Sequence, residues 1–542
     1  MRGTSHAGPR WMERVSGALQ RRAGAWWRRI ARSPRAVSPE GALRWLRECA
    51  GRDLGLSPTC GTTAVCPGLT AAAVPTLWNF GESEQALAYA RSLLALQRRD
   101  GSIPDAGLLH VSLFNTAQTI RAWRTLIDDG ALAEALPALR KACNYLVSRI
   151  DDDGSLRIPS GGGAFERWAP PAVQLAGLAE IVTAAHRFQM PQWRLAVARA
   201  AERVVRCEEF GFGKAASHVA AHGIEALLDL AAIDPRCETL ARRALDQAAA
   251  CLRNDGSLTV DLAHAWTSSA GLAHFAALWF RTGQRRIGNA AMQCLAAHQL
   301  PTGGWYGSWG RGAAFFPHGG SAWTAKYALD AAHAQVEAAF AGAPNMLLEP
   351  LSPADERLHF VRRLADDTIA RCGTTARIAD IGCGSGRYVR ALSESLPRLR
   401  LTGIDPSAAL LEHLPERAAA VRGNLLRLPT DDEAFDAAFC VEALEHALVP
   451  ARAVDELCRV VRPGGRVVII DKDAQFQALS HCDPWEHWFG AQSLALKLAE
   501  HCDDVRCEPL PMGPQQRTPG LFLCWSGTKR AAAATLRLAR AA

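Results

Sequence analysis

The sequence predicts a multidomain chain in which an all-α repeat domain precedes an α/β domain. An Asp-Gly-Ser loop recurs between apolar helical segments in the first two-thirds of the chain. Three prolines in residues 340–356 then interrupt this pattern, and strands alternate with helices after them. We therefore expect a basic tail at 1–38, the repeat domain at 39–340, a linker at 341–352, the α/β domain at 353–530 and a tail at 531–542.

The N-terminal tail carries the basic character of the chain. Residues 1–35 hold nine Arg and one acid, Glu13, whereas the remaining 507 residues sum to a charge of −1. Because these 507 residues are nearly neutral, they are not expected to carry the basic surface that nucleic-acid binding needs, and we expect no nucleic-acid partner. The Trp residues between these Arg would suit peripheral contact with an anionic membrane, the alternative being a disordered basic tail.

Cysteine usage and hydropathy indicate the compartment. The sequence has no apolar run of 18 residues and no pattern of a cleavable secretory leader, so we expect neither a spanning helix nor secretion. Its 16 Cys are scattered without a C-x-x-C pair, which indicates reduced thiols in a cytoplasm. The spacing of Cys60 and Cys66 does not match a zinc site, and we predict no metal.

The repeat domain is marked by one glycine per loop. Taking Gly101, Gly154, Gly211, Gly256 and Gly304, the spacings are 53, 57, 45 and 48 residues. A helical pattern precedes each loop, and a second helix with few charges follows it. A sixth candidate is the Cys60-Gly61 loop, 40 residues before Gly101. Because a helix apolar on nearly all sides must be buried, we expect six helical hairpins closed into a ring, with the second helix of each pair inside.

The segments Leu96–Ser102 (LQRRDGS) and Gly304-Trp305 are similar to the Q…DGSW repeats of the terpene cyclase group. The repeat also resembles protein prenyltransferases, several glycoside hydrolases and glucuronyl C5-epimerases. This resemblance implies an (α/α)6 toroid. The catalytic Asp-x-Asp-Asp of the cyclases is missing, and the acidic run Asp151–Asp153 is typical of a turn, so cyclase activity is not expected.

Toroids of this kind bind ligands in the loops before the inner helices. Those loops carry Asp105, His110, Glu166, Arg167, Trp168, His218, His222, Asp261, His264, Trp266, Tyr306, Trp309, His318 and Trp323. Glycosidase chemistry needs two facing carboxylates, and Glu166 with Asp261 is the pair we consider. For each single His, a hydrogen-bonded core residue is the simpler interpretation.

The α/β domain begins with a glycine-rich turn between a strand and a helix. A strand at Arg377–Ile381 leads into Gly-Cys-Gly-Ser-Gly, and a second strand ends at Asp405. Such a turn brings a ligand close to the backbone, and an acid on the second strand can accept hydrogen bonds from ribose hydroxyls. Arg387 stands where a dinucleotide fingerprint needs its third Gly, so the turn favours S-adenosylmethionine instead.

Further strands are predicted at Ala419–Arg422, Phe435–Val441, Arg466–Ile470 and, as an antiparallel edge pair, Val505–Leu510 and Leu521–Ser526. Four motifs occur in order: DIGCGSG, GID, FDAAFCVEALEH and VVRPGGR. Together they resemble the class I S-adenosylmethionine-dependent methyltransferases, especially the ubiquinone and menaquinone group. The resemblance implies a Rossmann-like domain of seven strands that transfers methyl groups.

The cofactor-binding positions that this resemblance implies are Asp380, Gly382, Cys383, Gly384, Gly386, Asp405, Pro406, Asn424, Leu425 and Glu442. The glycines would line the methionine and ribose, with Asp380 beneath them and Asp405 on the ribose hydroxyls. Asn424 replaces the usual Asp at the adenine amino group and still offers an acceptor oxygen. Leu425 would flank the adenine.

For the acceptor, His446 is the candidate base, although Glu445-His446 could simply open the next helix. His481, Trp485 and Trp488 would line an acceptor pocket, unless the Trp pair packs the insert onto the sheet.

We therefore expect an S-adenosylmethionine-dependent methyltransferase acting on oxygen of a glycan, a lipid-linked sugar or another small acceptor, which the toroid recruits. The alternatives are a carbohydrate-active toroid (lyase, hydrolase or epimerase) with a degenerate methyltransferase domain, and a toroid that is a non-catalytic adaptor.

Overall fold

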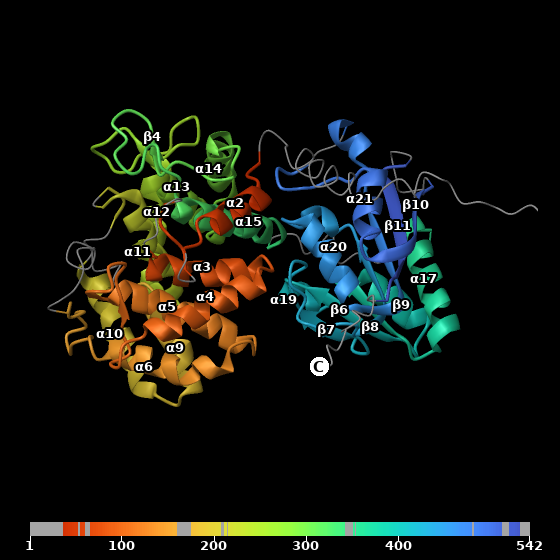
Figure 1. Ribbon diagram of the computed structural model, residues 1–542, viewed down its shortest axis with the longest axis horizontal. Helices are drawn as coiled ribbons and strands as arrows, with labels where there is room; N and C mark the ends of the chain where they lie inside the picture. Colours follow the sequence, from red (N-terminus) through yellow and green to blue (C-terminus); the bar gives the residue numbers. More distant parts are fainter. Residues whose placement is uncertain are drawn as a thin grey trace, which may run out of the picture. The chain divides into compact units, whose positions relative to one another are not determined.

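The computed structural model describes residues 36–51, 55–59, 65–159, 175–207, 211–213, 215–341, 351–352, 354–479, 482–511 and 520–531. The chain divides into two compact units, Arg35–Gly342 and one that contains Ala343–Ala542. The first is built of helices and the second around a sheet (Figure 1). Within the described ranges, no helix is both long enough and apolar enough to cross a membrane. Residues 1–35 of the basic tail lie outside these ranges.

Two sets of helices alternate along the helical unit. The described part of the inner set is α3 (Pro67–Asn79), α5 (Leu113–Asp128), α9 (Leu178–Arg187), α11 (Ser217–Leu230), α13 (Ser269–Arg281) and α15 (Ala322–Phe340). The outer set is α2 (Pro39–Glu48), α4 (Ser83–Leu96), α6 (Leu136–Val147), α10 (Pro191–Cys207), α12 (Pro235–Ala250) and α14 (Arg285–His298). Each inner helix packs against the next, and α15 packs against α3, so this succession of contacts returns to its start.

Short elements connect these helices. They are β1 (Ile103–Pro104) paired with β2 (Val111–Ser112), β3 (Thr267–Ser268) paired with β4 (Ser308–Trp309), and the 3-10 turn η2 (Ala133–Ala135). Ser112, Ser268 and Ser321 each precede an inner helix, and each side chain accepts a hydrogen bond from the amide three residues later. These serines satisfy one of the free amides of the first helical turn, which explains why the inner helices begin there.

The repeated loops follow the outer helices and have a common geometry. In the first, Oδ1 of Asp100 accepts hydrogen bonds from the amide and the hydroxyl of Ser102. Gly101 has φ +97°, and a Cβ there would overlap a backbone carbonyl of the following outer helix, so only glycine fits. The same approach joins Gly101 to Lys141 of α6, Gly154 to Arg199 of α10, Gly256 to Ala290 of α14, and Gly303 to Gly41 of α2.

The last loop thus links the last outer helix to the first. Nε2 of Gln299 donates to the carbonyl oxygens of Gly303 (2.9 Å) and Ser38 (3.0 Å). Gln97 makes the same pair of bonds within the first loop and to α6. The glycine of the last copy that corresponds to Gly101 is therefore Gly303 rather than Gly304.

The second unit contains a seven-stranded sheet in the order β10-β11-β9-β8-β5-β6-β7. Its strands are β5 (Arg377–Ile381), β6 (Arg400–Asp405), β7 (Ala419–Arg422), β8 (Phe435–Val441), β9 (Val461–Lys472), β10 (Cys502–Pro509) and β11 (Phe522–Lys529). The neighbours from β7 to β9 pair in parallel, β11 is antiparallel to β9, and β10 is antiparallel to β11. The predicted antiparallel pair at the edge of the sheet is confirmed.

One strand is longer than expected. The sequence predicts a turn at Pro463-Gly464-Gly465 before the fifth strand, but β9 already begins at Val461. The register between β8 and β9 shifts between Phe435 and Ala437, so the extra residues form a bulge in the strand.

The helices of this unit are α17 (Glu356–Cys372), α18 (Arg387–Ser395), α19 (Ala408–Leu411), α20 (Pro450–Arg459) and α21 (Ala491–Leu498), with 3-10 turns η3 (Leu444–His446) and η4 (Ala474–Leu479). The chain moves along the sheet in one direction from β5 to β7 and in the other from β8 to β9. β5 is therefore the point at which the strand order reverses. Open α/β sheets bind their ligands outside the carboxyl ends of the strands at such a point.

Candidate functional site

The loop from Gly382 to Gly386 lies at the carboxyl end of β5. Gly382, Gly384 and Gly386 all have positive φ, between +54° and +76°. A Cβ on Gly382 would overlap the side chain of Ala443, whereas a Cβ on Gly384 would have no atom within 4 Å. The first glycine is thus required by packing, and Gly384 borders open space into which a ligand can approach the backbone.

Asp405, at the end of β6, is bonded to this loop. Its Oδ2 accepts from the amide of Gly384 at 2.9 Å, and its Oδ1 accepts from the amide of Ser407 at 2.9 Å. Burial raises the pKa of the Asp405 carboxyl, while the two amide bonds act in the opposite direction. Each oxygen retains a lone pair, so the carboxylate can still accept hydrogen bonds from two hydroxyls.

Asp380 lies on β5 directly before the loop and is 2% exposed. Its Oδ2 has no hydrogen-bond partner among the described residues. Burial, together with the nearby Asp405, raises the pKa of Asp380 well above its usual range. A buried carboxyl oxygen without a donor is costly, and a ligand that brings a donor or a positive charge would offset that cost.

The remaining predicted cofactor positions border the same loop. A Cβ at Gly382 would lie 3.9 Å from Cδ1 of Leu425, which places that side chain beside the loop. Oδ1 of Asn424 accepts the amide of Leu426 at 2.9 Å and so caps its own turn. Cys383 is buried, and burial raises the pKa of its thiol. Pro406 is exposed, and its carbonyl accepts from Arg422.

Glu442 follows β8, and its contacts include a residue that the sequence analysis missed. Its carboxylate forms an ion pair with Arg357 of α17, which also binds Asp355 at 2.7 Å. The φ of Glu442 is +52°, an uncommon value for a side chain other than glycine. No motif marks Arg357, because its role depends on α17 packing beside β8.

His446 ends η3 among buried acids. Its Nε2 lies 3.4 Å from Oε1 of Glu445, which also accepts from Nζ of Lys472 at 2.9 Å. Burial first, and then Lys472 nearby, lower the pKa of His446 to about 4. The imidazole is therefore neutral at neutral pH and can accept a proton, although it is a weak base. Burial raises the pKa of Glu445.

The predicted acceptor pocket is described only in part, because His481 lies outside the described residues. Trp485 is 5% exposed and Trp488 is 2% exposed. Nζ of Lys472 lies 5.2 Å from the centre of the Trp488 ring, a cation–π contact. The burial of both rings agrees with packing of the insert onto the sheet, which was the alternative role for this pair.

The loops of the helical unit place the other predicted residues. Asp261 accepts from the amides of Ala263 and His264 and contacts Nδ1 of His264 at 2.9 Å. Burial alone would raise the pKa of Asp261, but these bonds lower it. The carboxylate is therefore ionised, and its hydrogen bonds go to residues of its own turn. Glu166, the other half of the proposed carboxylate pair, lies outside the described residues together with Arg167 and Trp168.

His222, in contrast, is part of a buried cluster on α11, α13 and α15. Its ring centre lies 4.9 Å from that of His274, which bonds to Glu225 at 3.2 Å. Burial, with His274 nearby, lowers the pKa of His222 well below its usual range. Neither Glu225 nor His274 was predicted from the sequence. The His-x-x-Glu spacing on one helix face was the available signal for Glu225, while His274 stands alone in an apolar helix.

The sheet order and the glycine loop with its two acids define the second unit as a methyltransferase domain. Residues 379–469 match the family model described as "Methyltransferase domain". Ubiquinone biosynthesis O-methyltransferase of Alkalilimnicola ehrlichii is 37% identical over 124 residues, which cover 20% of this chain and 49% of that protein. Demethylmenaquinone methyltransferase of Clavibacter sepedonicus is 30% identical over 144 residues, 24% of this chain and 58% of that protein.

Among solved structures, N-methyltransferase NodS from Bradyrhizobium japonicum WM9, in complex with S-adenosyl-L-homocysteine, is 20% identical with a TM-score of 0.29 and covers 37% of this chain and 99% of that one. The chain spans between 38% and 58% of the length of the curated relatives that it matches first. The family match lies within the second unit.

The cofactor of this domain is S-adenosylmethionine, which supplies an activated methyl group on a sulfonium. The residues present fit this group. The unpartnered oxygen of Asp380 offers an acceptor for a cationic ligand, and Asp405 offers acceptors for ribose hydroxyls. The open space at Gly384 admits a ligand to the backbone. Because the donor is already activated, a protein that binds it has mainly to position the acceptor.

Proposed function

We propose that the whole chain is an S-adenosylmethionine-dependent O-methyltransferase in which the helical unit recruits the acceptor. The observation that carries this proposal is the Asp405 carboxylate, which is bonded to the amide of Gly384 beside the open face of the loop. In this arrangement Asp405 orders the loop and binds the ribose, Asn424 and Leu425 receive the adenine, and Glu442 borders the cofactor.

We propose further that the helical unit is an (α/α)6 toroid. Two features support this fold: the contacts of the inner helices return from α15 to α3, and the loop glycine Gly303 approaches Gly41 at the other end of the unit's sequence. A closed ring leaves no end helix uncovered, which removes the need for capping repeats.

The exposed side chains of its loops support a lipid-linked acceptor. Six large apolar residues are exposed within the described ranges, and five of them lie in loops before inner helices: Leu108, Leu109, Leu262, Tyr306 and Phe316. The β3–β4 pairing joins two of these loops. Leu262, Tyr306 and Phe316 lie on the two loops that are joined. Exposed apolar groups on adjacent loops are typical of a binding surface, and an isoprenoid or acyl chain would bury them.

Calorimetry with S-adenosylmethionine tests the cofactor site. We expect Asp405→Ala in the full chain to weaken binding by about 10- to 100-fold, because hydrogen bonds to a charged group contribute about 1.5–3 kcal/mol each. Asp366→Ala, on the exposed face of α17, is the matched control and should bind like the parent. Equal affinity of the two variants would remove Asp405 from the site.

The acceptor is tested with isotopically labelled S-adenosylmethionine and two fractions of the source cells, a lipid extract and an aqueous glycan extract. We expect the label in the lipid fraction. Leu109→Ser and Leu262→Ser should raise KM for that fraction without changing kcat, whereas Leu195→Ser, the exposed apolar residue on α10, should change neither. Label confined to the aqueous fraction would exclude the lipid-linked acceptor.

A further inference from the structure

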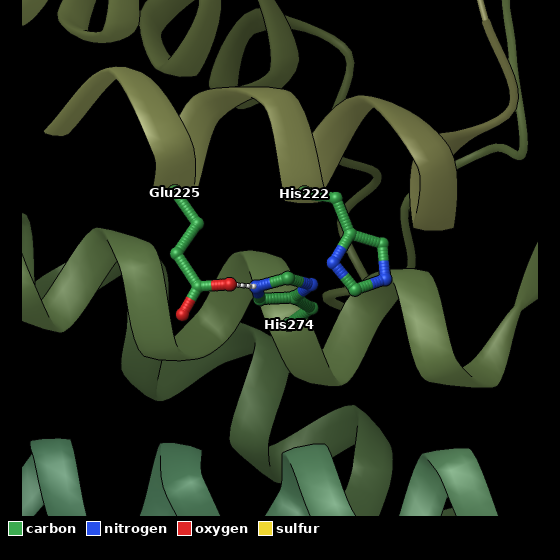
Figure 2. Close-up of side chains that lie close together, drawn as sticks. All are labelled: His222, Glu225 and His274. Atoms are coloured by element: carbon green, nitrogen blue, oxygen red, sulfur yellow. Dashed lines mark hydrogen bonds and ion pairs between the residues drawn. The ribbon is translucent and has the colours of Figure 1, made fainter. Parts of the chain in front are cut away.

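The inner helices hold a cluster of metal-ligating side chains that the methyltransferase site does not use. His222 and Glu225 are three residues apart on α11 and therefore share one helix face, and His274 reaches them from α13. Figure 2 shows the imidazole of His274 between the carboxylate of Glu225 and the imidazole of His222. The two His side chains are buried, at 7% and 2% exposure.

The distances in this cluster are close to those of a metal site. Nε2 of His274 lies 3.2 Å from Oε2 of Glu225, and one donor atom of each of the three residues lies within 4.8 Å of the others. Zinc binds imidazole nitrogen at about 2.0–2.1 Å and carboxylate oxygen at about 2.0–2.2 Å in tetrahedral sites, so neighbouring ligand atoms stand about 3.4 Å apart. The Glu225–His274 edge is already near this value, and the other two edges are at most 4.8 Å.

Neighbouring side chains hold the three candidate ligands by hydrogen bonds and ring stacking, as is common around metal ligands. Nη1 of Arg121 donates to Oε1 of Glu225 at 2.7 Å, which orients the carboxylate and leaves Oε2 toward the two His. The hydroxyl of Tyr327 lies 3.2 Å from Nε2 of His222. The ring of Tyr327 stacks on the ring of His274, with the ring centres 4.0 Å apart. Such outer contacts fix ligand rings in place.

Carboxylates outside the cluster also compensate the nearby positive charges. Arg121 also binds Glu180 and Asp229, and Lys326 binds Asp330 at 2.7 Å. The field that would repel a cation is therefore reduced at the cluster.

A cavity borders the cluster on the side of Glu225 and His274. It has a volume of about 550 Å³, and its lining includes Glu225 and His274 together with Arg281, Asp330 and His333. In addition, Nδ1 of His274 has no hydrogen-bond partner within the described residues. A site with three protein ligands keeps a position for water or a small ligand, and the cavity provides room for one.

We propose that His222, Glu225 and His274 bind one divalent transition-metal ion, with Zn²⁺ as the probe, inside the helical unit. Two imidazoles and a carboxylate are ligands that suit Zn²⁺ and Fe²⁺. The prediction of no metal rested on cysteine spacing and does not bear on this site, because its ligands include no cysteine. The proposal is independent of the methyltransferase function.

The experiment uses the full chain, dialysed against a chelator and then against Zn²⁺, with bound metal measured by mass spectrometry and melting by calorimetry. We expect about one zinc per chain and a higher Tm with zinc than without it. His222→Gln and Glu225→Gln should each weaken zinc binding by at least about tenfold and abolish the zinc-dependent rise in Tm. Co²⁺ should give visible ligand-field absorption in the parent chain that His222→Gln lacks.

His501→Gln is the matched control, because His501 belongs to a different cluster with Asp455 and Glu500 in the methyltransferase unit. It should retain zinc like the parent chain. A parent chain that keeps no zinc after dialysis would overturn the proposal even if the variants fail to fold. Equal zinc content in His222→Gln and the parent, or a loss confined to His501→Gln, would overturn it as well.

Discussion

The amide of Gly384 donates a 2.9 Å hydrogen bond to Oδ2 of Asp405 and so joins the glycine loop after β5 to the end of β6. These residues are 21 positions apart in the sequence and meet because the two strands are parallel neighbours in register. The bond fixes the loop before any ligand arrives, and a preorganised site loses less entropy when it binds.

Gly384 provides a test of the open face of this loop. Gly384→Ala places a methyl group where the structure has no atom within 4 Å, at φ +54°. The variant should fold with a cost of about 1–2 kcal/mol for the left-handed conformation, and should bind S-adenosylmethionine at least about tenfold more weakly. Gly464→Ala carries the same strain in equally open space within β9 and should bind normally in the same calorimetric titration. Equal losses in both variants would indicate a folding effect only.

Asp380 should link stability to pH. Burial and the nearby Asp405 raise its pKa in the folded chain above the unfolded value of about 3.9. A group with a raised folded pKa stabilises fully below the unfolded pKa, and this contribution is lost as the pH rises toward the folded pKa. Asp380→Asn should therefore raise Tm relative to the parent at pH 7, by about 2 °C or more, and this gain should vanish near pH 4.

The same variant should bind S-adenosylmethionine more weakly, because it removes an acceptor of negative charge. Scanning calorimetry at several pH values gives the Tm difference, with Asp366→Asn on α17 as the control. An Asp380→Asn variant that melts with the parent at pH 7 would contradict the raised pKa.

Gly303 tests the closure of the helical unit. Ala at this position would overlap the backbone of Gly41 and would have to adopt φ +98°. Gly283→Ala requires a similar φ of +81° but meets no atom within 4 Å. We expect chemical denaturation of Gly303→Ala to show a free energy of unfolding at least about 2 kcal/mol lower than that of Gly283→Ala. Similar values for the two variants would mean that α2 and the last loop are not held together.

His446 is tested through its weak basicity. With a pKa lowered to about 4, its imidazole is neutral throughout the range from pH 6 to 8. The titration of His446 should therefore cause no change of kcat with pH in that range. If it accepts the acceptor's proton, His446→Gln should lower kcat by about 100-fold and leave S-adenosylmethionine affinity unchanged. His501→Gln is the control in the same unit. An unchanged kcat for His446→Gln would leave the base role to another group.

Much of the methyltransferase domain could be predicted from the sequence because its determinants are local. The strands at Arg377–Ile381, Ala419–Arg422 and Phe435–Val441 have the predicted limits, since β-branched and apolar runs end at glycine or at an acid. The bulge at Gly464 was not foreseen, because a Pro-Gly-Gly segment predicts a turn equally well.

The recurring glycine loops, the order of the helical and α/β units and the cofactor could be predicted from residue types at short and regular spacing, although the glycine of the last loop is Gly303 and not the predicted Gly304. The packing of distant elements, by contrast, brings Arg357 to Glu442 and places His274 beside His222 and Glu225. The pairs Glu225–His274 and Arg357–Glu442 are 49 and 85 residues apart in the chain. Their meeting depends on how whole helices and strands pack, and no local pattern encodes that.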